Sequence, residues 1–173
     1  MPDFERPAWC DDARVFYSRI DKGRDDPVSV FIPPGGDVTD ENPGTLRLRL
    51  HPSGRALDVL DHRGCNDGVI RSEGLVRGVC FVMRRNDGPV WRLSVRSVVR
   101  KRHELRFTSG EVWMFDTPFY WWQGLTGTLA GAPRLIGHVG PRKTFWLFGV
   151  EAGHDADDVL AAVAVLHRNW WRW

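Results

Sequence analysis

The chain of 173 residues lacks any apolar run long enough to cross a membrane. Its longest uninterrupted apolar run is the eight residues from Val159 to Leu166, whereas a membrane-spanning helix needs about 20. The first ten residues include Asp3, Glu5 and Arg6 and contain no apolar segment of the kind found in secretory signals. We therefore expect neither a transmembrane helix nor a signal peptide.

Cysteine, lysine and catalytic motifs are also scarce. The three cysteines show no CxxC spacing, so we expect no disulfide framework and no cysteine-based zinc site, and a reducing cytoplasm is predicted. The six histidines form no metal-binding pair, so neither a metal nor a cofactor is expected. GxGxxG, GxxxxGK[ST], HExxH and GxSxG are absent. Only three of the 24 basic residues are lysine, a bias typical of bacterial genomes rich in G and C.

Charge is unevenly distributed, although the net charge is only +2. Residues 1–44 hold five basic and ten acidic side chains, residues 45–153 hold seventeen and nine, and residues 154–173 hold two and three. An acidic N-terminal arm, 1–44, with a short strand or strands, for which Val28–Ile32 is the candidate, therefore precedes a basic body, 45–173. We expect the arm to pack on this body, and such asymmetry is also typical of chains that bind anionic partners.

Alternating apolar residues predict antiparallel strands in the body. Leu46–Leu50 alternates leucine with arginine, and Trp91–Arg96 repeats the alternation. The consecutive valines Val98 and Val99 break the period, which predicts a bulge or bend there. Glycine-containing turns recur roughly every 8–12 residues and no helical periodicity appears between 45 and 150, so a sandwich or barrel is indicated.

The last apolar segment predicts a helix over 155–170 that is buried on every side. Asp155 is a suitable N-cap, and Asp157 and Asp158 favour the positive end of the helix dipole. Val159–Leu166 contains no polar residue, whereas a surface helix keeps a polar stripe. A helix without a polar face must be enclosed, so we predict a mainly β fold: a closed antiparallel β-barrel around a hydrophobic C-terminal α-helix.

This layout resembles the tubby C-terminal-like superfamily, which includes the phospholipid scramblases and the LURP-one-related proteins. The resemblance covers roughly 45–170, and its most telling stretch is residues 124–167, GLTGTLAGAPRLIGHVGPRKTFWLFGVEAGHDADDVLAAVAVLH, which reads as strand, glycine turn, strand, acidic cap and apolar helix. It implies a barrel of about twelve strands. Tubby proteins bind phosphoinositides through basic side chains on the barrel, but no such residue matches here one by one. The palmitoylated cysteine cluster of scramblases is absent, so lipid translocation is not expected.

The densest basic run is the candidate binding site for an anion or a lipid head group. It consists of Arg96, Arg100, Lys101, Arg102 and Arg106, and it would be extended by Arg142 and Lys143. Arginine suits this task because its forked guanidinium matches phosphate oxygens. The alternative interpretation is a solvated hairpin face that Glu104 partly neutralises.

Two aromatic groups are candidates for either a membrane interface or the interior. The first is Trp113, Phe115, Phe119, Tyr120, Trp121 and Trp122, which we interpret as barrel core. The second is Trp170, Trp171 and Trp173, which we interpret as a plug at one end of the barrel, with a membrane-interface anchor as the alternative.

These patterns predict a non-enzymatic, cytoplasmic domain, peripheral at the membrane, that binds anionic phospholipid head groups or another anionic partner at a basic outer face. The alternative is a lipocalin-like or helix-grip module that holds a small apolar ligand between the sheet and the C-terminal helix. A hydrolase or cyclase would need convergent acids, and Glu73, Glu111 and Asp116 are candidates that no spacing singles out. Nucleic acid is not an expected partner, because no recognition helix or aromatic RNA-binding motif is present.

Overall fold

A computed structural model describes ten segments of the chain. These are residues 15–21, 28–32, 46–52, 55–61, 63–74, 79–98, 101–116, 124–139, 145–148 and 156–169, with the backbone alone for 15–21, 28–32, 136, 138–139, 145–148, 156 and 167–169.

The described residues form twelve strands and one helix. The strands are β1 (Val15–Asp21), β2 (Val28–Ile32), β3 (Leu46–Leu50), β4 (Ala56–Leu60), β5 (Asn66–Ser72), β6 (Cys80–Arg85), β7 (Gly88–Ser97), β8 (Arg102–Phe107), β9 (Val112–Asp116), β10 (Leu125–Leu129), β11 (Ala132–Val139) and β12 (Phe145–Phe148). The helix is α1 (Ala156–Asn169), within one residue of its predicted bounds at each end.

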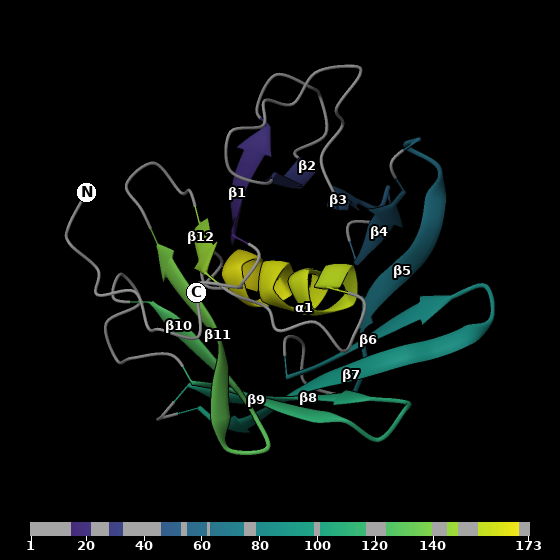
Figure 1. The fold of residues 1–173 in the computed structure, drawn as a ribbon. Coiled ribbons are helices and arrows are strands. Elements are labelled where there is room, and N and C mark those ends of the chain that lie inside the picture. Colours follow the sequence, from purple (N-terminus) through teal and green to yellow (C-terminus); the bar gives the residue numbers. More distant parts are fainter. Residues whose placement is uncertain are drawn as a thin grey trace.

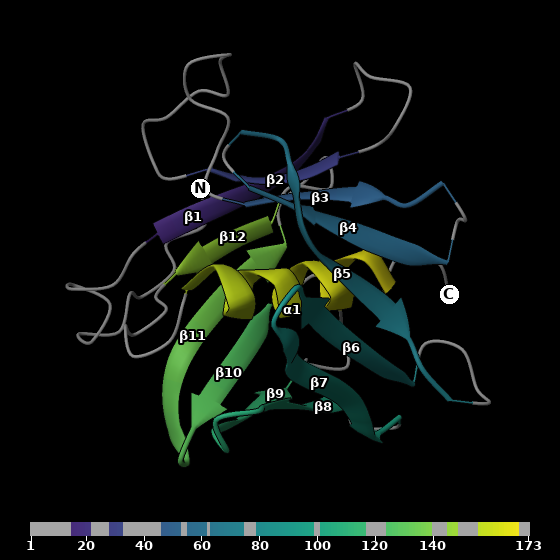
Figure 2. The same cartoon turned by 90° about the vertical axis from the view of Figure 1, so that its right-hand side faces the viewer.

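Neighbouring strands in the chain pair antiparallel from β1 through to β12. β1 pairs in addition with β12, where Val15 lies opposite Phe148, so the pairings return to the strand from which they start. Figures 1 and 2 show α1 in the middle of the molecule with strands on opposite sides of it. The predicted mainly β fold, with antiparallel strands and one C-terminal helix, is confirmed.

The alternation in the sequence explains which faces are buried. Successive side chains in a strand point to opposite faces. In β3, Leu46 and Leu48 are 3% and 1% exposed, while Arg47 and Arg49, which alternate with them, lie on the outer face. β7 repeats the pattern with Trp91, which is 1% exposed. The inward rows of the strands therefore supply one wall of the core.

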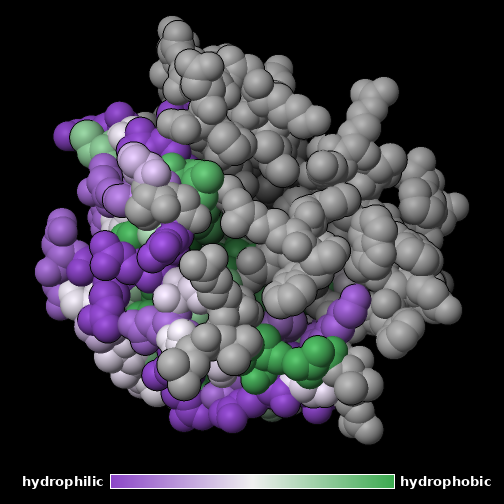
Figure 3. Space-filling view, turned by 180° about the vertical axis from the view of Figure 1, so that it is seen from behind, coloured by the Kyte–Doolittle hydropathy of each residue, from purple (hydrophilic) through white to green (hydrophobic). Residues whose placement is uncertain are grey.

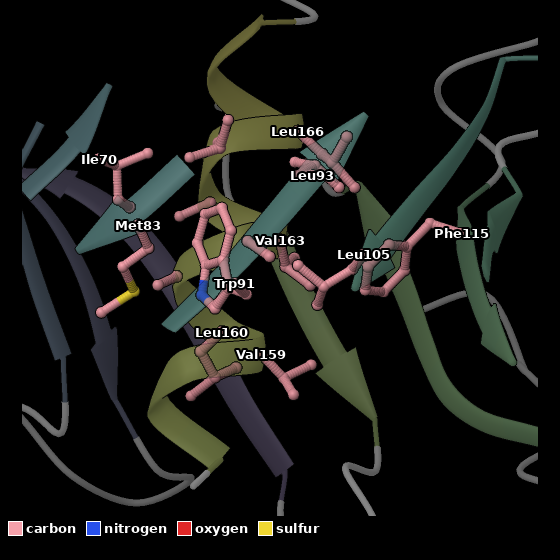
Figure 4. Packing of buried hydrophobic residues seen from close by; sticks show 14 of the residues in the cluster. Ile70, Met83, Trp91, Leu93, Leu105, Phe115, Val159, Leu160, Val163 and Leu166 are labelled. Carbon is pink, nitrogen blue, oxygen red and sulfur yellow. The ribbon is translucent and has the colours of Figure 1, made fainter. Parts of the chain in front are cut away.

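The other part of the core is α1, whose side chains from Val159 to Leu166 are all at most 3% exposed. In Figure 4, Met83 and Trp91 lie beside the helix residues Leu160 and Val163. A helix that is apolar on every face is expected to be buried on every face, and this prediction is confirmed. Asp155, the predicted N-cap, lies outside the described residues.

An ion-paired cluster fixes the start of α1 against the sheet. Asp158 lies in the first turn, and its Oδ1 is 2.9 Å from a terminal nitrogen of Arg85 in β6. The Nε of the same arginine is 3.2 Å from Asp67 in β5. A carboxylate in the first turn is also favoured by the helix dipole.

Two features of the strands, β1 in the N-terminal arm and the bulge of β7, go beyond what the sequence predicted. The predicted strand Val28–Ile32 is β2, and the arm contains a second strand, β1, whose bounds were not predicted and which lies between β2 and β12. The division of the chain at residue 44 stays a prediction. The bend predicted at Val98 and Val99 is confirmed at Val98, which lies in the turn after β7, whereas the bulge of this strand falls earlier, between Val95 and Ser97. Val99 lies outside the described residues.

Candidate functional site

The predicted basic run lies around the hairpin of β7 and β8. Arg96 is near the end of β7, Lys101 is in the connecting turn, and Arg102 and Arg106 are on β8. The remaining predicted site residues, Arg100, Arg142, Lys143, Trp170, Trp171 and Trp173, lie outside the described side chains.

Glu104 neutralises part of this run, as the alternative interpretation expected. Its carboxylate is 2.7 Å from Arg96 and 3.1 Å from Arg106, and its side chain is only 12% exposed. Burial alone would raise the pKa of Glu104, but the hydrogen bonds and charges of the two arginines outweigh burial and lower it. The three side chains together carry a net charge of +1.

Arg102 has its own carboxylate partner, Asp116 at the end of β9. The Nε of Arg102 is 2.6 Å from Oδ1 of Asp116, and both side chains are exposed. The hydrogen bond with this carboxylate, and then its charge, raise the pKa of Arg102 above its ordinary value. Arg102 therefore adds no net charge to the surface on its own.

The register of β5 to β8 brings together a row of arginines that the sequence does not show as a group. Arg71 in β5 lies opposite Val82 in β6, Val82 lies opposite Arg92 in β7, and Arg92 lies opposite Arg106 in β8. We call Arg71, Arg92 and Arg106 the arginine row. All three are exposed, whereas Met83 and Trp91, the neighbours of Val82 and Arg92, are buried in the core. The row therefore lies on the outer face of the sheet.

The arginine row is only partly neutralised. Within the part of the chain that the structure describes, no carboxylate forms an ion pair with Arg71 or Arg92, and Arg92 instead donates from Nε to Sγ of Cys80 at 3.0 Å. Together with the +1 around Glu104, these two arginines bring the local charge to +3. Neighbouring strands lie about 5 Å apart, so Arg92 is about 5 Å from Arg106 and about 10 Å from Arg71, and the ends of the row are about 15 Å apart. Arg92 therefore lies within reach of the same phosphate-bearing ligand as either of the other two arginines.

Hydrophilic side chains dominate the described part of the face on which β5 to β7 lie. In Figure 3, seen from behind, they cover the left side and the lower edge of the molecule. Cross-strand pairs of like charge such as Arg92 and Arg106 are destabilising in a sheet. A sheet that keeps such a pair exposed has a surface that a bound anion would stabilise.

The acids considered for catalysis do not converge on one point. Glu73 is 3.3 Å from Arg84, and Asp116 pairs with Arg102. Glu111 accepts a hydrogen bond from the indole nitrogen of Trp113. Because Glu111 precedes β9 and Asp116 ends it, these two acids lie at opposite ends of one strand.

The described residues offer little for metal or thiol chemistry. No three or more of their histidines, cysteines and acids gather as a metal ion would require. Cys65 and Cys80 are both free, the first exposed and the second buried. No helix among the described residues combines the length and the apolar character that crossing a membrane takes.

The first aromatic group belongs to the core as far as it is described. Trp113 and Phe115 are both 0% exposed, and their rings stack with centroids 6.3 Å apart. The predicted core position of these two rings is confirmed. Phe119, Tyr120, Trp121 and Trp122 lie outside the described residues.

Comparison with known proteins adds no assignment. No family model, no curated protein and no solved structure matches the chain. The surface therefore has to be interpreted from its own residues. Arg71 and Arg92 were not predicted as site residues, because only the register of β5 to β8 brings them into one row.

Proposed function

We propose that the protein is a non-enzymatic binding domain whose outer face over β5 to β8 binds phosphate-bearing anions, either lipid head groups or soluble polyphosphates. The observation that carries the proposal is the arginine row, because Arg71 and Arg92 are exposed cations to which no carboxylate of the described residues is paired. Hydrogen bonds from guanidinium groups to phosphate are charge-assisted and frequently bidentate, so arginine is the residue best suited to this ligand.

The distribution of polar groups supports an outer rather than an inner site. The inward rows and α1 form one cluster of buried apolar side chains, whereas the charged side chains of β5 to β8 lie outside it. Anionic ligands are held by cations at an accessible surface, since a charge in an apolar interior carries a large desolvation cost.

The proposal includes the architecture expected from the sequence. We take the ring of strand pairings to be a closed barrel of about twelve strands that encloses α1, which the pairing of β1 with β12 supports. The same features support the resemblance to the tubby C-terminal-like superfamily, whose members bind phosphoinositides on a barrel surface.

A calorimetric titration with inositol hexakisphosphate at low salt tests the proposal. We expect the unaltered protein to bind, and the double variant Arg71→Gln, Arg92→Gln to bind at least tenfold more weakly, since one hydrogen bond to a charged group contributes roughly 1.5–3 kcal/mol. Binding should also weaken as salt rises, because exposed charges are screened.

The matched control is the double variant Arg84→Gln, Arg102→Gln, which changes the net charge by the same amount. Both of these arginines already have carboxylate partners, Glu73 and Asp116. We therefore expect the control to bind within a few-fold of the unaltered protein. Equal weakening in the two double variants would show that net charge alone matters, and no binding at low salt would remove the proposal.

One observation favours the alternative of an interior ligand. The indole N–H of Trp91, a residue 1% exposed beside α1, has no hydrogen-bond acceptor among the described residues. Buried donors are rarely left unpaired, so an acceptor oxygen of a small molecule would satisfy this indole N–H. If such a ligand is bound, native mass spectrometry of the purified protein would show its added mass. The apolar side chains that surround Trp91 in Figure 4 argue against this alternative.

A further inference from the structure

Two residues of β6 are buried on the outer face of the sheet. Cys80 and Val82 are 9% and 7% exposed, and neither belongs to the apolar cluster around α1, whereas the next residue, Met83, does. Arg92 of β7 lies opposite Val82, and its Nε donates a hydrogen bond to Sγ of Cys80 at 3.0 Å. The side chain of Arg92 therefore reaches diagonally across β6, and the stem of an arginine covers apolar surface in this way.

The two neighbours in the arginine row, Arg92 and Arg106, are each held by an acceptor on an adjacent strand position. Arg106 donates to Oε1 of Glu104, from Nε at 3.3 Å and from a terminal nitrogen at 3.1 Å. Glu104 lies opposite Ser94 of β7, and Cys80 lies opposite the same serine on the other side. The register thus places a thiol and a carboxylate on either side of Ser94, where each accepts from one arginine of the row.

The two acceptors differ in charge. The carboxylate of Glu104 cancels one of the positive charges around it, whereas the sulfur of a thiol is a neutral acceptor. Arg92 therefore keeps its full charge while its Nε is held. Among the described residues nothing accepts a hydrogen bond from its terminal nitrogens, so these remain available to a ligand.

We propose that Cys80 is a positioning residue of the anion site: its sulfur holds the guanidinium group of Arg92 without neutralising it, so that the terminal nitrogens are presented to a phosphate group. The inference rests on the proposed function and adds to it a residue that carries no charge and does not itself contact the ligand. A long side chain that becomes ordered only on binding weakens the affinity, and an arginine that is held beforehand avoids this loss.

Calorimetric titration of single variants with inositol hexakisphosphate at low salt tests this role. Cys80→Ala removes the acceptor, and we expect it to bind about three- to tenfold more weakly than the unaltered protein. Cys80→Ser keeps a neutral acceptor, so its affinity should stay within about twofold. The matched control is Ser94→Ala, which removes a hydroxyl opposite Cys80 that does not hold Arg92, and it should bind as the unaltered protein does.

Two further measurements separate positioning from a general effect on the fold. In the background of Arg92→Gln, Cys80→Ala should cause no further loss of affinity, because the side chain that the thiol holds is already gone. Without any anion, hydrogen exchange of the Arg92 Nε–H should be faster in Cys80→Ala than in Cys80→Ser. Thermal unfolding of each variant verifies that it is folded at the temperature of the titration.

Two outcomes would overturn the inference and leave the proposed function standing. The first is equal affinity of Cys80→Ala, Cys80→Ser and the unaltered protein. The second is the same loss from Cys80→Ala with Arg92 and with Gln at that position, which would assign the cysteine to the packing of the sheet alone. No binding of inositol hexakisphosphate by the unaltered protein would instead remove the proposed function, and the role of Cys80 with it.

Discussion

His103 predicts a specific dependence of stability on pH. In β8 it lies opposite Val95 and Phe115, in the same inward row as the buried Leu105. Its Nδ1 is buried, and no group of the described residues forms a hydrogen bond with it. Burial lowers the pKa of His103 from 6.5 to about 4, and the backbone hydrogen bond with Lys101 and the charge of Asp116 offset only part of that effect.

The sign of the effect follows from the two pKa values of His103. The folded protein binds this proton less tightly than the unfolded chain does. The contribution of uncharged His103 to the free energy of unfolding is therefore present above about pH 6.5 and is lost as the pH falls toward about 4. A difference of about 2.5 between the pKa values corresponds to roughly 3 kcal/mol, of which about 2 kcal/mol is lost by pH 5.

Urea unfolding at about pH 7.5 and about pH 5 measures this loss. We expect the free energy of unfolding to fall by about 2 kcal/mol more in the unaltered protein than in His103→Gln, whose side chain does not titrate. The two proteins differ only at residue 103, so the contributions of all other groups to the pH dependence cancel to first order. The same fall in both proteins, or a rise at the lower pH, would refute the buried, uncharged state of His103.

Three further substitutions test the packing. Leu160→Ala should lower the free energy of unfolding by about 2–5 kcal/mol in urea titrations, because Leu160 is 0% exposed, and a loss below about 1 kcal/mol would contradict its enclosure. Gly127→Ala should cost roughly 1–3 kcal/mol and lower the melting temperature, since the new Cβ would lie 2.9 Å from a ring carbon of Phe115; an unchanged melting temperature would contradict the close packing. Asp158→Asn should cost roughly 2 kcal/mol by calorimetry through the lost charge of its pair with Arg85, and no loss would show that the pair does not hold the start of α1.

The helix and the alternating strands could be predicted because their signals are local. The eight apolar residues from Val159 to Leu166 leave no face for water, and they prove buried throughout. Leu46 and Leu48 occupy the buried face that the period of two assigns to them. In both cases the pattern of apolar residues within one short segment predicts which side chains are buried. Contacts between segments that are far apart in the sequence are not needed for this prediction.

The arginine row could not be predicted because it depends on register. Arg71 and Arg92 are brought to one row by the pairing of β5, β6 and β7, and the register of β6 on β7 shifts between Met83 and Arg84. A change of one residue in such a register would move a side chain to the opposite face. Nothing in the segments themselves fixes where these shifts occur.

The exposure of Val98, which is 79%, could not be predicted for a related reason. The consecutive valines at 98 and 99 indicated an irregularity, but the bulge falls at Arg96, and Val98 then lies in the turn. An apolar residue in a predicted strand is normally assigned to the core. Only the position of the bulge decides between a buried valine and one at the tip of a hairpin.

The most direct test of the anion-binding surface is to follow the arginine side chains themselves. In a titration with inositol hexakisphosphate, the Nε–H resonances of assigned arginines report which guanidinium groups meet the phosphate. We predict that the signals of Arg71 and Arg92 shift with the added ligand, while those of Arg84 and Arg102 stay within the changes that salt alone produces. Shifts confined to Arg84 and Arg102, or spread evenly over all arginines, would contradict the account.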